Sequence, residues 1–448
     1  MTEKLPKGWK RCLISEIAEI VSGGTPSSKD LSNFADSTGI PWITPADLSG
    51  YKDKFIAAGK RFLSEKGLKC SSARVLPAGT VLFTSRAPVG YVAIAANPVA
   101  TNQGFKSFVI KSEVLSEYLY YYLKSQKEAI ESLASGTTFL ELSGGNAKKI
   151  TVVLPPIDEQ KQIVARLDQL LARVDSCRAH LDRAAAAIKR FRQSVLNAAV
   201  TGQLTYELNL TTNKDLEQIA DYLSKQSNLK KNETDKLTVS LDYDLPPHWC
   251  TAPLGLLISA CSYGSSQKSA KTGLIPVLRM GNIQSGILDW EDLVYTSDQT
   301  EIDKYLLEPG DVLFNRTNSP ELVGKTAMYK EGTPKAIYAG YLIRVKTLPA
   351  LNPQFLTYCL NSSYGRHFSW QVKTDGVSQS NINASKLCAF PTPICSRTEQ
   401  DEIVRRAEAL FQKAYEMESK LTAARERVDN LTASILAKAF RGELFVIR

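Results

Sequence analysis

The sequence predicts an α+β fold with two related globular domains, each followed by a long helix, and with the two helices paired as an intramolecular coiled coil. Three observations lead to this prediction. The chain of 448 residues repeats itself with an offset of 240 residues. The first part of each copy consists of short strand-like runs, and the last part carries an uninterrupted heptad pattern. The expected boundaries are globular domain 1 at 1–155, long helix 1 at 156–205, an acidic linker at 206–244, globular domain 2 at 245–393 and long helix 2 at 394–448.

The repeat is clearest near the ends of each copy. EQKQIVARLDQLLARVD begins at Glu159, and EQDEIVRRAEALFQKAY begins 240 residues later at Glu399. Trp9 and Trp249 open the copies in LPKGWK and LPPHWC, and SVLNAAVTGQL and SILAKAFRGEL close them. Between these anchors IPWITPADLSG resembles IPVLRMGNIQSG, and much of the rest differs. The two copies therefore share a framework and differ in what fills it.

Each globular part is predicted to be a compact α+β domain. β-branched and aromatic runs such as VLFTS, YVAIA and SFVI alternate with Gly, Pro, Ser and Asn, which is typical of short strands joined by turns. One helical segment interrupts the strands, near 115–134 in the first copy and near 353–368 in the second. Tyr118, Tyr121 and Tyr122 share a face of the first segment, and this spacing favours core packing over a platform for stacking bases.

The long helices carry apolar residues in alternating steps of four and three over five heptads. Neither helix contains Gly or Pro before Gly202 or Gly442, which suit C-terminal caps. About 42 residues at roughly 1.5 Å each give a rod of about 60 Å, too long to bury its stripe on one small domain. We therefore expect the two helices to bury their stripes against each other, with these core residues: Ile163, Leu167, Leu170, Val174, Leu181, Ile188, Phe191, Val195, Ile403, Leu410, Met417, Leu421, Val428, Leu431 and Ile435.

Pairing of the helices would fix the distance and the rotation between the globular domains. An antiparallel pairing would place the domains at opposite ends, related by a pseudo-two-fold axis. A DNA duplex offers that same symmetry to a reader with two domains. Domains with different surfaces would then read two different half-sites.

The bulk composition is that of an ordinary globular protein, with 43% hydrophobic and 23% charged residues. The formal net charge of +9 is compatible with nucleic-acid binding without proving it. The chain has neither a long apolar run nor the apolar core of a signal peptide, so we expect a cytoplasmic protein without membrane contact. The eight cysteines are scattered singly along the sequence, which indicates reduced thiols packed as small hydrophobes. With only three histidines as well, the sequence does not predict a metal site.

No catalytic motif is complete in this sequence. Gly324-Lys325-Thr326 resembles the end of a phosphate-binding loop, but the glycine required five residues earlier is replaced by Ser319. The Pro-Pro segments lack the flanking residues of an adenine methyltransferase. Neither a nucleophile elbow nor a histidine-centred triad is evident. We therefore expect a chain that binds rather than catalyses.

These features together resemble the specificity subunit of Type I restriction-modification enzymes. The resemblance rests on LPKGWK, LPPIDEQKQIVARLDQLLARVD and RFRQSVLNAAVTGQLT in the first copy, and on EQDEIVRRAEALF and VDNLTASILAKAFRGEL in the second. It covers essentially the whole chain, and it is specific in the helical segments and loose in the domains. The resemblance implies that each globular domain is a target recognition domain, that the two bind a split site in double-stranded DNA, and that the paired helices act as a ruler.

The same resemblance implies the partners of the chain. Two modification (methyltransferase) subunits would dock on the helices and use S-adenosylmethionine to methylate one adenine in each half-site. Restriction subunits would use ATP and Mg to translocate and cut DNA, and this chain would hold no cofactor. Two alternatives stay open from the residues alone: a bifunctional restriction and methylation enzyme, and a coiled-coil scaffold that binds protein and not DNA.

DNA contacts are expected from loops at the edge of each domain. Lys and Arg suit phosphates, whereas Arg, Asn, Gln, Ser and Thr suit base edges. The candidates in domain 1 are Lys29, Thr44, Arg86, Asn102, Gln103 and Lys106. The candidates in domain 2 are Tyr263, Gln267, Lys268, Arg279, Asn282, Arg316, Asn318, Gln379 and Asn381.

Overall fold

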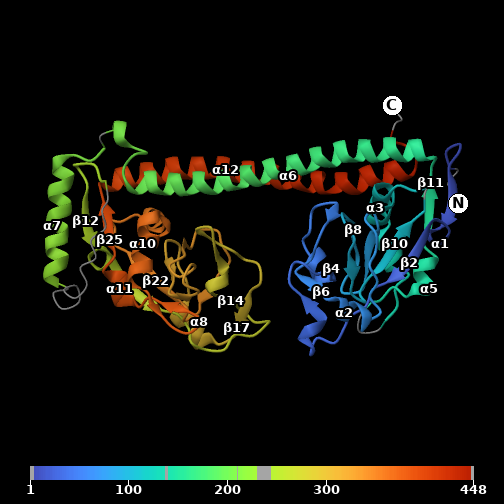
Figure 1. The fold of residues 1–448 in the computed structure, drawn as a ribbon. Helices are drawn as coiled ribbons and strands as arrows, with labels where there is room; N and C mark the ends of the chain where they lie inside the picture. The colour runs from blue at the N-terminus through green and yellow to red at the C-terminus, as the bar shows by residue number, and fades with distance from the viewer. Residues whose placement is uncertain (1–4, 112, 137–139, 209, 230–243, 445–448) are drawn as a thin grey trace. The chain divides into compact units, whose positions relative to one another are not determined.

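The computed structural model describes residues 5–111, 113–136, 140–208, 210–229 and 244–444. They belong to two compact units: unit 1 is Met1–Asp182 with Thr422–Arg448, and unit 2 is Arg183–Leu421. Each unit contains one globular domain and part of both long helices, α6 (Ile157–Val200) and α12 (Arg397–Phe440), as Figure 1 shows. In the described ranges, no helix combines the length and the apolar character that crossing a membrane requires.

The globular domain of unit 1 is built from short strands and five short α-helices. Its strands are β1 (Lys10–Leu13), β2 (Ala18–Ser22), β3 (Phe34–Ala35), β4 (Ile40–Ile43), β5 (Phe55–Ile56), β6 (Arg61–Leu63), β7 (Val81–Ser85), β8 (Val89–Ala95), β9 (Ala100–Thr101), β10 (Lys106–Ile110) and β11 (Thr151–Leu154). Its helices are α1 (Ile14–Ile17), α2 (Glu65–Lys69), α3 (Ser116–Ser125), α4 (Lys127–Glu131) and α5 (Gly144–Lys148), with 3₁₀ turns η1 (Leu31–Asn33) and η2 (Pro45–Leu48). The strands form sheets in the orders β2-β10-β7-β8-β5, β3-β6-β4-β9 and β1-β11.

The core of unit 1 lies on both faces of its five-stranded sheet. Val81 and Phe83 of β7 join a cluster with α3 and the ends of the long helices, whereas Leu82 joins a cluster on the opposite face. This alternation follows from the two-residue period of a strand. The rings of Tyr118 and Tyr122 meet the ring of Phe440 edge-on, with centroids 5.4 and 5.1 Å apart. The predicted core role of the α3 tyrosines is therefore confirmed, and these contacts attach α3 to the end of α12.

The globular domain of unit 2 has a related set of elements. Its strands are β12 (Cys250–Pro253), β13 (Ile258–Tyr263), β14 (Ile275–Leu278), β15 (Ile283–Gln284), β16 (Ile287–Leu288), β17 (Val294–Thr296), β18 (Val312–Asn315), β19 (Thr317–Asn318), β20 (Thr326–Met328), β21 (Ile337–Tyr338), β22 (Leu342–Thr347), β23 (Thr374–Asp375), β24 (Ser380–Asn381) and β25 (Pro391–Ile394). Its helices are α7 (Asn213–Leu229), α8 (Gln299–Tyr305), α9 (Pro353–Asn361), α10 (Ser363–Val372) and α11 (Ala384–Cys388), with 3₁₀ turns η3 (Tyr206–Leu208), η4 (Leu254–Leu256) and η5 (Met280–Asn282). The main sheet has the order β13-β22-β18-β20, beside sheets β17-β14-β21, β19-β24-β23, β12-β25 and β15-β16.

Helix α7 is the main addition to the predicted arrangement. The sequence analysis assigned 206–244 to an acidic linker, whereas residues 213–229 of it form this helix. Ile219, Tyr222 and Leu223 pack against the main core of unit 2, near η4. Leu256 of η4 is buried there, whereas the residue 240 positions earlier is Glu16. The apolar surface that receives α7 is therefore specific to the second copy.

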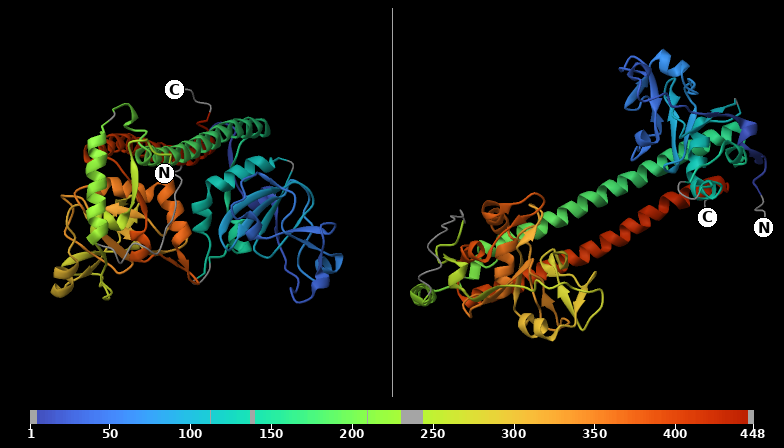
Figure 2. Two further views of the ribbon diagram at one scale, coloured as in Figure 1. Left: turned by 90° about the vertical axis from the view of Figure 1, so that its left-hand side faces the viewer. Right: turned by 90° about the horizontal axis from the view of Figure 1, so that it is seen from below.

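The two long helices run antiparallel inside each unit, and Figure 2 shows them side by side. In unit 1, Arg178 Nη2 donates to Thr432 Oγ1 at 3.1 Å, and four residues further along α6 Asp182 pairs with Arg425. In unit 2, Arg192 Nη2 lies 2.8 Å from Glu418 Oε2. Rising numbers in α6 thus meet falling numbers in α12, which confirms the predicted antiparallel pairing.

The predicted seam of the coiled coil is wrong at three residues. Phe191, Met417 and Leu431 are 40%, 56% and 46% exposed, and the adjacent Arg192 and Glu418 face the partner helix instead. The prediction alternated spacings of four and three residues throughout. Near the start of each helix the inward-facing positions are instead separated by two successive spacings of four, because a real α-helix drifts against a strict 3.5-residue repeat. Five of the predicted core residues are buried: Ile163, Leu167, Val174, Val195 and Ile403. The other predicted core residues are half-buried: Leu170, Leu181, Ile188, Leu410, Leu421, Val428 and Ile435.

Buried glutamines attach each domain to the start of its own helix. Gln160 accepts a hydrogen bond from the backbone of Leu115 at 2.9 Å and donates to two carbonyl oxygens at 3.0 Å. Gln400 repeats the pattern with the backbone of Asn352 at 2.8 Å and two carbonyls at 3.0 Å. Because both side chains are at most 1% exposed, these bonds are shielded from water.

The end of the other copy's helix completes each domain. After α12, Gly442 has φ +78° and lies against Pro6, and after α6, Gly202 has φ +72° and lies against Pro246. A Cβ at either glycine would come within 2.6 Å of the proline ring, so glycine meets both the backbone and the space requirement. Each unit therefore takes its globular domain from one repeat and a helix end from the other.

Candidate nucleic-acid interface

Three predicted residues of unit 2 meet at one end of its main sheet. Tyr263 ends β13, Arg316 follows β18 and Asn381 belongs to β24. The guanidinium carbon of Arg316 lies 4.5 Å from the ring centre of Tyr263, and Arg316 Nη2 donates to Asn381 Oδ1 at 3.1 Å. We call these residues the arginine cluster. Strand ends bring them together from positions more than 50 residues apart in the sequence.

Neutral groups hold the arginine cluster in place. Asn381 Nδ2 donates to Thr317 Oγ1 at 2.8 Å, and the Tyr263 hydroxyl accepts from the backbone of Ala384 at 2.9 Å. Arg316 Nε is buried and has no hydrogen-bond partner within the described ranges. An arginine oriented by an amide and an aromatic face keeps its full charge and its planar donors for an incoming acceptor. Such a group suits a phosphate or the acceptor edge of a guanine.

The corresponding sheet end of unit 1 is organised differently. Arg86 Nη1 lies 3.9 Å from Glu141 Oε2, so a carboxylate partly offsets its charge. Lys106 is 9% exposed, and its Nζ donates to the hydroxyl of Ser22 at 3.1 Å. The two predicted cations thus lie on neighbouring strand ends with different partners. Unit 1 presents an arginine–glutamate pair and a lysine where unit 2 presents one stacked arginine.

Other predicted residues build the loops that carry these side chains. Thr44 caps the start of η2, and its hydroxyl and backbone nitrogen donate to Asp47 Oδ2 at 2.6 and 2.8 Å. In unit 2 the backbone nitrogen of Arg279 donates to Asn282 Oδ1 at 2.9 Å, the same cap on η5. Asn282 is 3% exposed and also donates to two carbonyl oxygens. The hydrogen-bonding groups of Thr44 and Asn282 are therefore engaged within their own turns.

Side-chain oxygens also fix two further turns. Asn102 Oδ1 accepts from the backbone of Gly104 at 2.9 Å, and Asn318 Oδ1 accepts from the backbone of Ser319 at 2.8 Å. The Arg279 side chain reaches outward and pairs with Asp292 at 3.2 Å. Five remaining candidates have exposed side chains in loops: Lys29, Gln103, Gln267, Lys268 and Gln379. DNA contact by any of these residues stays a prediction.

Sequence reasoning missed Glu141 and Ser22, the partners of the unit 1 cations. A signal for Glu141 was present, since it stands 240 positions before the predicted residue Asn381. Ser22 carried no comparable signal, because a serine in a Ser-Gly-Gly turn is an ordinary turn residue.

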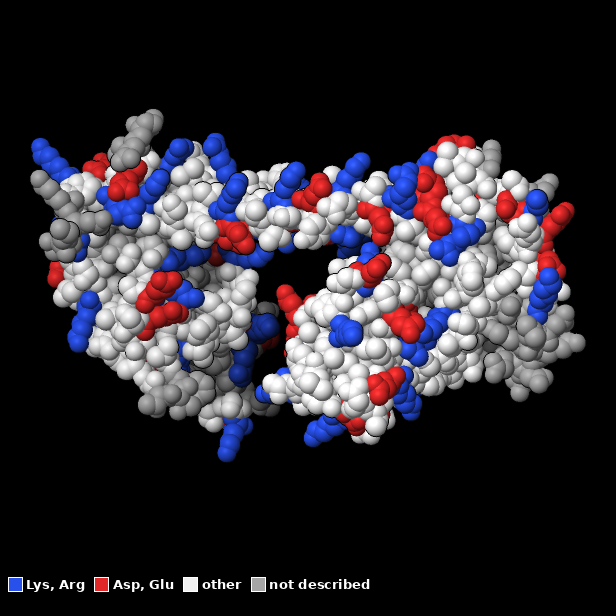
Figure 3. Space-filling view, turned by 180° about the vertical axis from the view of Figure 1, so that it is seen from behind, with Lys and Arg blue, Asp and Glu red and all other residues white. Residues whose placement is uncertain are grey.

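Charge is mixed over the surface of both units. On the face seen in Figure 3, basic and acidic side chains are interspersed over each globular domain and over the long helices. On this side, therefore, a uniformly basic surface does not identify the candidate interface. The sheet-end loops are distinguished by the partners of their arginines and lysines rather than by their net charge.

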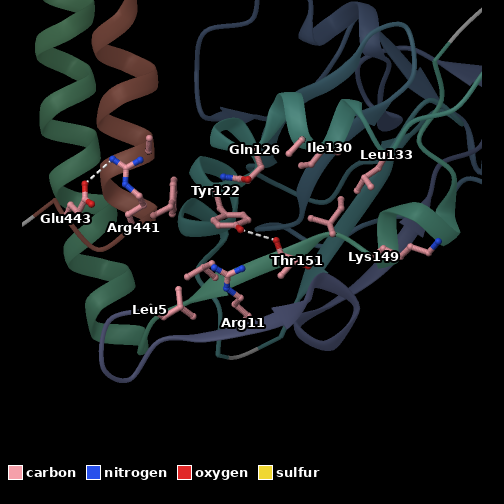
Figure 4. Close-up of a pocket in the computed structure, with 15 residues that line it drawn as sticks. Leu5, Arg11, Tyr122, Gln126, Ile130, Leu133, Lys149, Thr151, Arg441 and Glu443 are labelled. Carbon is pink, nitrogen blue, oxygen red and sulfur yellow. Dashed lines mark hydrogen bonds and ion pairs between the residues drawn. The ribbon is translucent and has the colours of Figure 1, made fainter. Parts of the chain in front are cut away.

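A pocket of about 640 Å³ in unit 1 does not have the character of an active site. It lies where the end of α12 meets β11 and the α3–α4 region, as Figure 4 shows. Tyr122 donates to the carbonyl of Thr151 at 3.0 Å on one side, and Arg441 pairs with Glu443 at 3.0 Å on another. Its lining contains no histidine or cysteine. In the described part of the chain, no group of three or more His, Cys, Asp or Glu residues is placed to hold a metal ion.

Comparisons with known proteins agree with the two-domain arrangement. The model of the Type I restriction modification DNA specificity domain matches residues 6–182 and 258–425. The EcoKI specificity subunit of Escherichia coli is 29% identical over 457 aligned positions, covering 98% of this chain and 90% of that protein. The MjaIX specificity subunit of Methanocaldococcus jannaschii is 44% identical over 166 residues, covering 37% of this chain and 38% of that protein.

Two solved structures show the same fold. One, from work on complex assembly and conformational transition of the type I R-M system, has a TM-score of 0.69 at 19% identity and covers 98% of this chain and 100% of that chain. The HsdS subunit from Thermoanaerobacter tengcongensis has a TM-score of 0.55 at 19% identity and covers 99% of this chain and 100% of that chain.

Proposed function

Because the chain belongs to the family of type I restriction-modification specificity subunits, whose role is DNA target recognition, we propose that each globular domain reads one half of a split DNA site. The observation that carries this proposal is the arginine cluster. Its guanidinium is preoriented at a sheet end and has neutral partners. The counterpart in unit 1 uses different residues, so the two domains would read different sequences.

The chain would act through partner subunits. Two modification subunits would bind it and methylate one adenine in each half-site with S-adenosylmethionine, and restriction subunits would add ATP-driven translocation and cleavage with Mg. In this family the catalytic steps belong to other subunits. This chain would therefore recognise the target sequence, hold no cofactor and place its partner subunits on the DNA.

The long helices would set the spacing between the two half-sites. Each is a single helix of 44 residues that contributes to both units, so a change in its length would change the spacing that the chain tolerates. Inserting one heptad in α6 alone would mismatch it against α12 and destabilise the pairing. Matched heptads in both helices would lengthen the tolerated spacer, and an unchanged spacer in that variant would contradict the ruler.

The test of DNA reading starts from the target itself. Mapping methylated adenines in a host with and without this chain gives the two half-sites. Binding is then measured on the target and on duplexes with one half-site scrambled. Arg316→Ala should lower affinity for the target by about 10- to 100-fold, the cost of one good base contact.

The loss should disappear when the half-site read by unit 2 is scrambled. Arg86→Ala should show the same behaviour for the other half-site. Equal losses on target and random DNA would assign both arginines to phosphates instead. A chain with its partner subunits present that binds duplex DNA without sequence preference would overturn the proposal and leave the scaffold alternative.

A further inference from the structure

Unit 2 contains a groove of about 700 Å³ between its globular domain and the long helices. One wall comes from Lys189 and Arg192 of α6, and another from Phe411 and Tyr415 of α12. The β15–β16 turn at 284–287, the residues Lys325 and Lys330 on either side of β20, and helices α9 and α10 form the rest. This groove lies apart from the arginine cluster, because the two share no residue.

The lining of the groove is strongly basic. Its five cations are Lys189, Arg192, Lys325, Lys330 and Arg366, and its one carboxylate is Glu408. Glu408 lies 3.1 Å from Lys330, and Glu418 outside the lining lies 2.8 Å from Arg192. Lys189, Lys325 and Arg366 have no carboxylate within ion-pair distance in the described part of the chain. The groove therefore holds an excess of about three positive charges.

Lys325 and Arg366 both line the groove and face the same solvent-filled space. Burial lowers the pKa of Lys325, and the nearby positive charge of Arg366 lowers it further. Lys325 Nζ donates to Gln284 Oε1 at 3.1 Å, a neutral partner. Like charges that line one groove repel each other, and an anion bound between them relieves the repulsion. This arrangement is typical of a site that awaits a negatively charged ligand.

The basic groove belongs to the second copy alone. Counting 240 residues along the repeat, Lys189 corresponds to Asp429 and Tyr415 corresponds to Asp175. In the segment where FLTYCLNS matches YLYYYLKS, the groove residue Tyr358 corresponds to Tyr121, whose hydroxyl bonds Asp168 in unit 1. Unit 1 thus places Asp429 and Asp175 on its helices where unit 2 has Lys189 and Tyr415. The cations are not required to attach a domain to the helices.

We propose that this groove binds the phosphodiester backbone of duplex DNA outside the bases that unit 2 reads. The inference rests on the proposed function, which brings a polyanion to this unit. Lys189, Lys325 and Arg366 supply charge for successive phosphates, and the faces of Phe411 and Tyr415 supply apolar contact for sugars. The contact adds affinity without sequence preference.

The test compares two double variants of the full chain with its modification subunits. Lys325→Gln with Arg366→Gln removes two groove charges. Lys214→Gln with Lys420→Gln removes two exposed charges elsewhere in unit 2 and is the matched control. Binding to the target and to a random duplex is measured between 50 and 300 mM salt.

The groove variant should lose roughly tenfold in affinity on both duplexes, and its slope of log affinity against log salt should fall by up to about 1.8, or about 0.9 per phosphate. The control should match the wild type. Lys325→Arg, which keeps the charge, should also bind like the wild type and exclude a folding defect. Ethylation of phosphates outside the half-sites should weaken wild-type binding and leave the groove variant unaffected.

Unchanged affinity and slope in the groove variant would overturn the proposal, as would a loss confined to the target duplex. Unchanged DNA binding with poorer recovery of the modification subunits would also overturn it and assign the groove to a protein partner. If the wild type binds random and target duplex equally, the proposed function fails, while the groove result is still read from the random duplex.

Discussion

Units 1 and 2 attach their domains to the helices by the same contacts but use the neighbouring space in opposite ways. In unit 1, Tyr121 and Lys54 both bond Asp168 of α6, with Lys54 Nζ 2.7 Å from the carboxylate. In unit 2 the residue that corresponds to Asp168 is Glu408, and Lys330 donates to it at 3.1 Å. Unit 1 thus closes the junction, and unit 2 leaves the basic groove open.

The positions that differ between the two copies are those where a new side chain disturbs few hydrogen bonds. Gln160 and Gln400 hold three buried or partly buried backbone groups each, and replacing either would remove a hydrogen bond from all three. Arg86 and Arg316 are half-buried at sheet ends and pair with single side chains, where a change of partner costs less. The attachment is therefore uniform between the copies, whereas the sheet ends and the junction differ.

The largest expected effect concerns the glutamates beside the two tryptophans. Glu159 bonds Trp9 at 2.8 Å and is half-buried, whereas Glu399 is 1% exposed and bonds Trp249, Thr205 and Thr211. Glu399→Ala should lower the free energy of unfolding by about 3 kcal/mol, because it leaves several buried donors without partners. Glu159→Ala should cost about 1 kcal/mol.

Urea unfolding followed by circular dichroism measures both glutamate variants. Similar losses in the two would mean that the extra contacts around Glu399 add no stability. The comparison between the units would then fail at this site.

A smaller effect separates the two lysines at the helix junctions. Lys54→Met should cost about 1 kcal/mol, since its side chain is only 19% exposed and its bond to Asp168 is charge-assisted. Lys330→Met should cost about 0.3 kcal/mol, because both partners are half exposed. Thermal unfolding of the two single variants gives the ranking, and a reversed order would show that unit 2 is closed as firmly as unit 1.

The smallest effect tests the corrected seam. Arg192→Glu should destabilise the helix pair by about 0.5 kcal/mol through repulsion from Glu418, and Glu418→Arg in the same chain should restore most of the loss. The double-mutant cycle is measured by urea unfolding at low salt. As a control, Leu431→Gln should be nearly neutral, since Leu431 is 46% exposed. A large loss there would support the seam first predicted from the heptads.

Much of the fold was readable because the repeat and the heptads are long-range regularities. The structure places α6 at 157–200 and α12 at 397–440, inside the expected ranges 156–205 and 394–448. The phase of the seam was not readable, because a drift of one residue changes which neighbour faces inward. Helix α7 was hidden since its polar sequence needs the apolar surface of unit 2 to bury its few hydrophobic residues.

The sequence predicted which residue types the candidate interface contains, but not which of those residues contact each other. The sequence singled out Arg316, Tyr263 and Asn381 separately, but only the pairing of strands brings them into one cluster. Thr44 and Asn282 have the composition expected of DNA contacts and of turn formers alike, and the structure engages them in turns. The basic groove depends on chain segments from five parts of unit 2, so no local pattern indicates it.

The shared construction of each unit has a consequence during synthesis on the ribosome. Tyr118 and Tyr122 of unit 1 are covered by Phe440, which is translated some 300 residues later. At 5–20 residues per second the gap lasts roughly 15 to 60 s. The first domain to leave the exit tunnel is therefore the last to be finished, and a nascent chain must keep that aromatic surface from aggregating until its final turns emerge.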